Sequence, residues 1–156
     1  MDMEGLAARY GGEVDETTRS RLRGHGTIEV RPVDPESLLL QRGSKDGFWL
    51  RIPSAEGADA DLNVCALAYA SDFWLAPAAR MRHARPFDFH DYQLASLDHA
   101  MWFHTPANAA DWFLYETDSP WAGGGRGLAR GAMYDRAGRM IASTAQEALM
   151  RRRAGG

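Results

Sequence analysis

Two polar residues stand where the surrounding sequence predicts an apolar, buried face. Asp72 lies on a helical stripe that runs from Val64 to Leu75 at intervals of three and four residues. Gln146 lies on the alternating face of a predicted final strand whose other members are apolar or small. Burying a carboxylate or an amide costs free energy unless the group is hydrogen-bonded, so each residue needs a partner or a function. Each also has an ordinary interpretation: Asp72 would reach water near a frayed helix end, and Gln146 would reach it at a sheet edge.

Other residues of reactive type lack the spacing that their chemistry requires. His99 and His104 are five residues apart, on opposite faces of a regular strand, which favours structural or hydrogen-bonding histidines over metal ligands. The remaining histidines, His25, His83 and His90, show no ligand spacing either. Ser119 has no nearby histidine and no Gly-x-Ser-x-Gly context for a nucleophile. The glycine-rich run over residues 123–127 lacks the strand–loop–helix setting of a phosphate-binding loop and predicts a bend.

The first half of the chain predicts two strands and one long helix. Alternation of apolar and polar residues predicts a strand at 27–33, and an apolar run predicts another at 48–52, joined by a turn-like connection over 41–47. A helix is expected from the acidic cap at 59–61 to about Arg80, with Pro77 disturbing or ending it. Because apolar residues extend widely around this helix, we expect a central element wrapped by other structure.

The second half predicts antiparallel strands after a long loop at 81–92. These strands are expected at 94–104, from residue 112 onward, at 128–134 and at 139–150, with a hairpin turn at 135–138. The strand at 94–104 has no cleanly polar face, which indicates that it is buried on both sides or bulged. Two strands, one long helix and three or four further strands predict an α+β hotdog fold, in which a curved antiparallel sheet wraps a central helix.

Composition sets the broad class of protein. The chain has 156 residues, 45% hydrophobic and 25% charged, which is typical of one globular domain. Its 18 Lys and Arg against 21 Asp and Glu give a net charge of −3, which argues against general nucleic-acid or membrane-surface binding. The single cysteine, Cys65, excludes an intrachain disulfide. No apolar run approaches the ~20 residues of a membrane span, and the N-terminus has no signal-peptide pattern, so a cytoplasmic protein is expected. The expected organisation is a tail at 1–26, a domain at 27–151 and a short tail at 152–156.

Several ordered motifs together resemble the acyl-CoA thioesterase II family, which includes bacterial thioesterase II and peroxisomal long-chain relatives. They are SLDHAMWFH at 96–104, DWFLY at 111–115, SPWAGGGRGL at 119–128, ASTAQE at 142–147, IEVRP at 28–32 and AYASD at 68–72. The resemblance covers about residues 27–151.

The resemblance implies hydrolysis of acyl-CoA thioesters without a metal or an organic cofactor. It assigns Asp72 as the base that takes a proton from water, and Ser96 and Gln146 as the residues that orient this water. Two of the three are the polar residues that the hydrophobic pattern singles out. On charge alone, Arg126 or Arg130 is expected to meet the phosphates of CoA.

The chain also departs from the family, whose members are usually double hotdogs about twice as long. It resembles the C-terminal hotdog alone, so we expect a second copy to replace the missing half in a homodimer or larger homo-oligomer. Thr105-Pro106-Ala107 stands where relatives commonly carry Arg-Pro-Phe. Two alternatives stay open: a hotdog hydratase or dehydratase that uses His99 with an acid, and a non-catalytic half that binds acyl groups or a partner hotdog.

Overall fold

The structure is a computed structural model that describes residues 27–40, 45–81, 83 and 91–153. In chain order, the elements within these residues are β1 (Glu29–Pro32), α3 (Pro35–Leu40), β2 (Lys45–Arg51), the 3-10 helix η1 (Pro53–Ala55), α4 (Ala60–Arg80), β3 (Tyr92–Ser96), β4 (Ala100–Phe103), β5 (Phe113–Gly123), β6 (Arg126–Tyr134) and β7 (Met140–Arg152). The tail expected at 1–26 and most of the loop expected at 81–92 lie outside the described residues.

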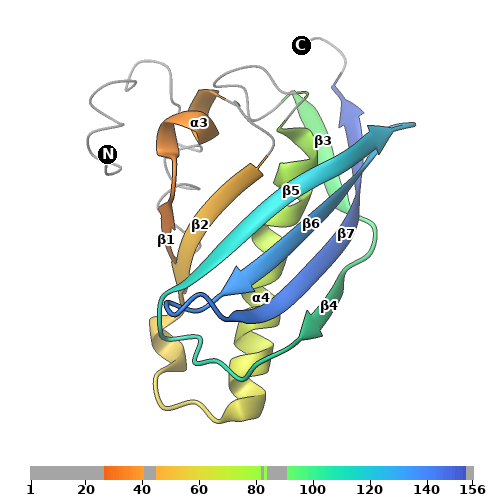
Figure 1. Cartoon of the computed structure of the whole chain (residues 1–156). Helices are drawn as coiled ribbons and strands as arrows, with labels where there is room; N and C mark the ends of the chain where they lie inside the picture. The colour runs from red at the N-terminus through yellow and green to blue at the C-terminus, as the bar shows by residue number, and fades with distance from the viewer. Residues whose placement is uncertain (1–26, 41–44, 82, 84–90, 154–156) are drawn as a thin grey trace.

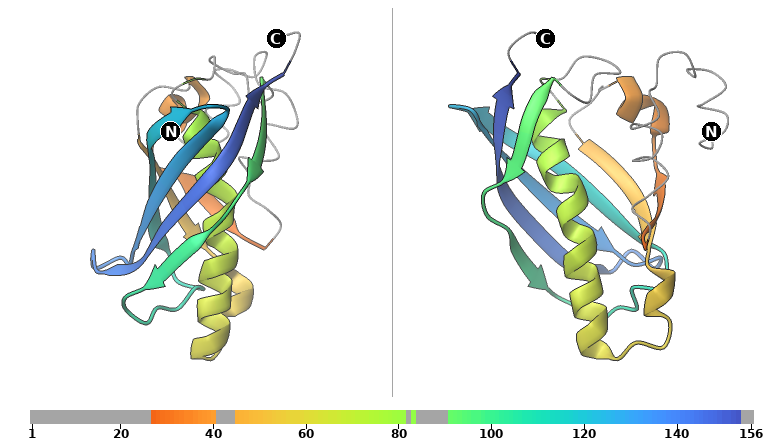
Figure 2. Two further views of the ribbon diagram at one scale, coloured as in Figure 1. Left: turned by 90° about the vertical axis from the view of Figure 1, so that its right-hand side faces the viewer. Right: turned by 180° about the vertical axis from the view of Figure 1, so that it is seen from behind.

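The strands form one antiparallel sheet with a long helix against it. The strand order is β1-β2-β5-β6-β7-β3, and β4 also pairs with β7. The sheet curves around one side of α4, which contacts β5, β6 and β7 (Figures 1 and 2). This is the α+β arrangement of a curved antiparallel sheet and a long helix that the sequence predicts.

The region before α4 differs from the sequence prediction in two ways. β2 begins at Lys45, so the last part of the connection expected over 41–47 is strand, while 41–44 lie outside the described residues. The short helix α3 was not predicted, although its start carries a standard signal. Asp34 accepts a hydrogen bond from the Ser37 backbone N–H at 3.0 Å, and Pro35 occupies the first helical position.

Helix α4 begins as predicted and does not end at Pro77. The Asp59 carboxylate accepts the Leu62 backbone N–H at 2.9 Å, which caps the first turn. The predicted end near Arg80 is confirmed, since α4 continues past Pro77 to Arg80. A proline in the final turn removes only one of the last hydrogen bonds, and the last turn is held by packing. Ala79 lies so close to β6 that a Cβ on Gly127 would be 2.8 Å from the Ala79 Cβ.

The sheet wraps one side of α4, in agreement with the predicted curved sheet around a long helix. Leu67, Ser71 and Leu75 of the predicted stripe are buried, and the buried face extends to Asn63 and Ala70 on one side of it. Val64, a member of the predicted stripe, is 41% exposed. The view from behind shows the far side of α4 with no described strand over it (Figure 2, right).

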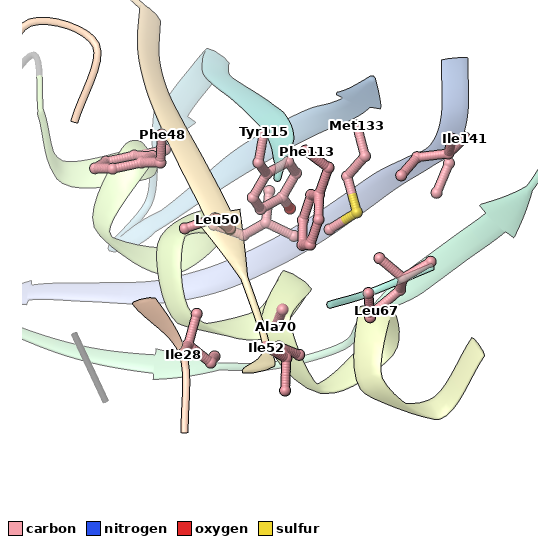
Figure 3. Close-up of a cluster of buried hydrophobic side chains, with 14 of the residues drawn as sticks. Ile28, Phe48, Leu50, Ile52, Leu67, Ala70, Phe113, Tyr115, Met133 and Ile141 are labelled. Atoms are coloured by element: carbon pink, nitrogen blue, oxygen red, sulfur yellow. The ribbon is translucent and has the colours of Figure 1, made fainter. Parts of the chain in front are cut away.

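The core lies between α4 and the inner face of the sheet. Side chains from β2, β5, β6 and β7 meet α4 there, among them Leu50, Tyr115, Met133 and Ile141, all at most 1% exposed (Figure 3). The predicted glycine-rich bend and the predicted hairpin turn are both present. Gly124 and Gly125 have φ angles of 58° and 75° in the β5–β6 turn, and Gly138 has a φ of 78° in the β6–β7 turn. No helix within the described ranges is long and apolar enough to cross a membrane.

Candidate active site

The structure brings Asp72, Ser96 and Gln146 together. Asp72 projects from the middle of α4, Ser96 ends β3, and Gln146 lies in the central part of β7. The Gln146 amide nitrogen donates to Asp72 Oδ1 at 3.2 Å, and the Ser96 hydroxyl donates to the same oxygen at 3.4 Å. One carboxylate oxygen therefore receives two donors from two different strands.

Gln146 is a fully buried polar side chain on an otherwise apolar face. Its exposure is 0%, and Ala148 and Ala142 on the same face of β7 are equally buried. The strand has β6 on one side and β3 and β4 on the other, so the sheet-edge interpretation is wrong. The amide satisfies its burial by bonding to Asp72 and His99 rather than to water.

Asp72 is not buried in this chain. Its side chain is 60% exposed, because the carboxylate lies at the border of the helix face that the sheet covers. Neither sequence interpretation is right in full: the residue reaches solvent, but it stands in the middle of α4, far from a frayed end. One part of the carboxylate is fixed by donors from the sheet, and the rest is open to an incoming molecule.

A bulge between β3 and β4 shapes this site. Ser96 pairs with Ala148, and Ala100 pairs with Ala145, so three residues on one strand oppose two on β7. The extra residue reverses the alternation of side chains, so that Ser96 and His99 both reach α4 although they are three residues apart. The single strand predicted over 94–104 is therefore two strands, and the bulged interpretation is confirmed.

His99 joins the cluster through both ring nitrogens. Its Nδ1 lies 3.2 Å from Gln146 Oε1 and 3.8 Å from Asp72 Oδ1. Its Nε2 lies 2.8 Å from the Ser71 hydroxyl on α4. The prediction of a hydrogen-bonding histidine is confirmed, and His99 lies on the inner side of the sheet, opposite to His104, as predicted. His104 bonds to Ser143 at 2.8 Å, on the outer side of β7.

A buried set of hydroxyl groups continues from this site into the core. Tyr115 on β5 donates to the Ser71 backbone oxygen at 3.1 Å and shares a 2.8 Å hydrogen bond with Thr144 on β7. Burial raises the pKa of Tyr115, the Thr144 bond acts in the opposite direction, and the Asp72 charge raises this pKa further. Tyr115 therefore stays a neutral hydroxyl that ties α4 to the sheet beneath Asp72.

The two arginines expected to meet CoA are not brought to this cluster. Ala129 pairs with Gln146 and is fully buried, so Arg130, the next residue on β6, faces the outer side of the sheet. Arg130 binds Asp118 through two hydrogen bonds of 3.1 and 2.7 Å. Arg126 lies on the same outer side and contacts Glu147 at 3.2 Å.

The remaining candidates of reactive type take structural roles. Ser119 donates to the Leu128 backbone oxygen at 2.8 Å, within the β5–β6 pair. Among the described residues, no group of three or more His, Cys, Asp or Glu side chains could hold a metal ion. His25 and His90 lie outside the described residues, and His83 is exposed.

Sequence reasoning missed the residues that connect the cluster. Ser71, Tyr115 and Thr144 were not singled out, and His99 was predicted only to form hydrogen bonds or to act in an alternative activity. The available signal was the strand with two mixed faces, since a bulge is what such a pattern permits. Its position could not be fixed without knowing the pairing of β3 and β4 with β7.

Several known proteins are similar to this chain in both sequence and architecture. Residues 10–150 match the model of the acyl-CoA thioesterase C-terminal domain family. Human acyl-coenzyme A thioesterase 8 is 39% identical over 127 residues, covering 80% of this chain and 39% of the human protein. The crystal structure of the acyl-CoA thioesterase II TesB2 from Mycobacterium marinum superposes with a TM-score of 0.71 at 38% identity, over 83% of this chain and 51% of that one.

A more distant structure supports the fold alone. A conserved protein with a hot dog fold from Alicyclobacillus acidocaldarius gives a TM-score of 0.64 at 16% identity, covering 82% of this chain and 47% of the other. The hotdog prediction is therefore confirmed. The chain spans about two fifths of the human relative and about half of the Mycobacterium marinum structure. With the match over residues 10–150, the chain belongs to the acyl-CoA thioesterase C-terminal domain family.

Proposed function

We propose that this domain hydrolyses acyl-CoA thioesters to a free fatty acid and CoA, with water held by Asp72, Ser96 and Gln146. The observation that carries the proposal is the meeting of two strand-borne donors on one oxygen of a helix-borne carboxylate. Gln146 supports it further, because a buried amide on an apolar face is costly unless its hydrogen bonds are needed there. Family membership supplies the reaction class.

In the proposed reaction, Asp72 takes a proton from water while the water oxygen bonds to the thioester carbonyl carbon. The tetrahedral intermediate then breaks its C–S bond, and the CoA thiolate leaves and receives the proton. Ser96 and Gln146 fix the carboxylate and the water relative to each other, which lowers the entropy cost of attack. A thiolate is a stable leaving group and water is the nucleophile, so the reaction needs no metal or organic cofactor.

A second copy of the chain is proposed to complete the site. β3 and β4 pair only with β7 among the described strands, which leaves a free sheet edge beside Ser96 and His99. Exposed apolar side chains follow this edge, with Leu97 at 50%, Trp102 at 54% and Phe103 at 43%. The unpaired backbone groups of such an edge can pair with a strand of another chain. A two-fold partner at this edge would also shield the partly exposed Asp72 carboxylate from bulk water. Light scattering is expected to give a dimer or larger homo-oligomer; a folded monomer at micromolar concentration would contradict this.

Two features support the proposed setting of the reaction in lipid metabolism and in a reducing compartment. Release of a fatty acid belongs to lipid metabolism. Cys65 is exposed and unpaired on α4, which fits a reducing compartment such as the cytoplasm.

The experiment must distinguish the proposed hydrolysis from two other functions. A hydratase or dehydratase would use His99 with Asp72, and His99 Nδ1 lies 3.8 Å from Asp72 Oδ1. A non-catalytic half would bind acyl-CoA without turnover. The test is release of free thiol from acyl-CoA substrates of increasing chain length, with hydration of enoyl-CoA measured beside it. Thiol release that Asp72→Asn abolishes supports the proposal, whereas enoyl-CoA hydration alone, or binding without turnover, would overturn it.

A further inference from the structure

We infer that His99 is a positioning residue that sets the orientation of the Gln146 side chain, so that its N–H group faces Asp72. The inference deepens the proposed function and rests on it. Gln146 can hold a carboxylate base only if its nitrogen, and not its oxygen, points toward that carboxylate. The family resemblance gives His99 no part in the chemistry, so its role is argued from contacts alone.

The orientation of Gln146 depends on two contacts. A glutamine amide can turn by half a rotation and exchange its oxygen and nitrogen. In the observed orientation, the nitrogen donates to Asp72 Oδ1 and the oxygen faces His99 Nδ1, each at 3.2 Å. The reversed orientation would place the amide oxygen against a carboxylate oxygen, with no proton between them. Both contacts favour the observed orientation, and the His99 contact lies on the less exposed side of the amide, since the His99 side chain is 26% exposed and that of Asp72 is 60% exposed.

In the observed orientation of Gln146, His99 Nδ1 must be the donor, because the amide oxygen that it faces can only accept. The Ser71 hydroxyl lies 2.7 Å from the Ala68 backbone oxygen and 2.8 Å from His99 Nε2. When this hydroxyl donates to Nε2, the neutral ring carries its proton on Nδ1. This arrangement places an Nδ1–H group against the amide oxygen of Gln146.

The backbone holds His99 at a fixed place relative to Gln146. The Asp98 carboxylate accepts the Glu147 backbone N–H at 2.6 Å, and the Glu147 backbone oxygen accepts the Leu97 N–H at 2.9 Å. Both bonds fasten the bulge to the residue next to Gln146. The bulge is therefore a device that aims the His99 ring at the glutamine.

The same contacts argue that His99 positions Gln146 and does not itself act as the acid or the base. Both ring nitrogens are engaged, one by Ser71 and the other by Gln146. The side chain is 26% exposed, against 60% for Asp72. His99 thus acts by orienting Gln146, and Asp72 is the residue that takes the proton from water.

The test compares two substitutions at one position. His99→Asn keeps an N–H group at the place of Nδ1, whereas His99→Leu fills similar space without a donor. We expect His99→Leu to lower kcat for thioester hydrolysis by about tenfold to hundredfold with little change in KM, since a misplaced group costs about that much. We expect His99→Asn to recover most of this loss. His104→Leu is the matched control, because it removes a histidine from the same segment that bonds only on the outer side.

A double-mutant cycle then tests whether His99 acts through Gln146. In the Gln146→Ala background, His99→Leu should cost much less than it does alone. Independent losses, equal losses in Asn and Leu, or an unchanged kcat in folded His99→Leu would each overturn the inference. NMR of 15N-labelled histidine provides a readout without turnover: an Nδ1–H signal that changes in Gln146→Ala supports the contact, and an unprotonated Nδ1 in the wild type overturns it. Absence of thioesterase activity in the wild type, by contrast, would reject the proposed function.

Discussion

The polar side chains on the two faces of β6 and β7 differ in burial and in the kind of partner that they bind. On the inner face, Gln146 and Thr144 are at most 3% exposed, and their partners come from other elements. On the outer face, Arg126 and Arg130 are at least half exposed and pair with carboxylates on the neighbouring strands. Because successive side chains of a strand point to opposite faces, a buried hydrogen-bonded group and an exposed ion pair can be neighbours in the sequence.

The difference lies in what each group loses if its partner is removed. A buried amide or hydroxyl without a partner keeps its full desolvation cost, whereas an exposed ion pair returns to water at little cost. We therefore expect large effects from substitutions on the inner face and small effects from equivalent substitutions on the outer face. The following experiments test this contrast, beginning with the largest expected effect.

Removal of the proposed base should have the largest effect. Asp72→Asn keeps the shape of the side chain and removes its proton acceptor, so thioester hydrolysis should fall by about 10²–10⁴. The matched control is Asp118→Asn, which makes the same change in an outer-face carboxylate bonded to Arg130. The measurement is thiol release, with folding checked by circular dichroism. Full turnover by folded Asp72→Asn would contradict the proposed mechanism and favour a binding module.

Filling the space beside Tyr115 should have the largest effect on stability. Gly131 lies on the inner face of β6, where a Cβ would be 2.5 Å from Thr144 Oγ1 and 2.8 Å from the Tyr115 hydroxyl oxygen. Gly131→Ala must push these groups apart, so we expect a loss of about 2–4 kcal/mol in the free energy of unfolding, measured by urea denaturation. Ala132→Val adds methyl groups to the outer face of the same strand and should cost far less. Equal losses in both variants would remove the contrast between the faces.

The sequence was sufficient to identify Asp72 and Gln146, because each breaks an apolar pattern that periodicity defines. It also gave the architecture, since one long helix between strands can bury its apolar side only against a sheet. It failed on the exposure of Asp72, which depends on how far the curved sheet reaches around α4. A helix that is apolar on several sides does not reveal which side the sheet covers.

The same limit applies to His99 and to the arginines. Which face a strand residue occupies depends on register, and one bulge reverses the result for every residue beyond it. The sequence could not locate the extra residue between Ser96 and Ala100, and regular alternation alone would put His99 on the opposite face from Ser96. Arg126 and Arg130 were chosen for charge, and charge does not tell on which face of β6 a side chain lies.

The inner face should also show a pH dependence of stability, through Asp46 on β2. Burial, together with the nearby Asp34 charge, raises the pKa of Asp46 from 3.8 to about 7, and Arg80 partly offsets this. Since the folded state prefers the protonated form, the contribution of Asp46 to stability is full below about pH 4 and is lost as the pH rises through 7. Urea unfolding should show Asp46→Asn gaining on the wild type by about 1–2 kcal/mol between pH 4 and pH 8. Parallel stability curves would show that Asp46 is solvated.

The smallest effects are expected at the outer-face arginines. Arg126 and Arg130 are 50% and 57% exposed and pair with carboxylates that are themselves partly in water. Exposed ion pairs contribute about 0–1 kcal/mol, so Arg126→Ala and Arg130→Ala should each shift the free energy of unfolding by less than about 1 kcal/mol. They should leave kcat unchanged, because the sheet separates both side chains from Asp72. The measurement that decides their role is KM for acyl-CoA against KM for a short thioester without the nucleotide: a rise confined to acyl-CoA would place the CoA phosphates on this face, and no rise would leave the arginines as surface pairs.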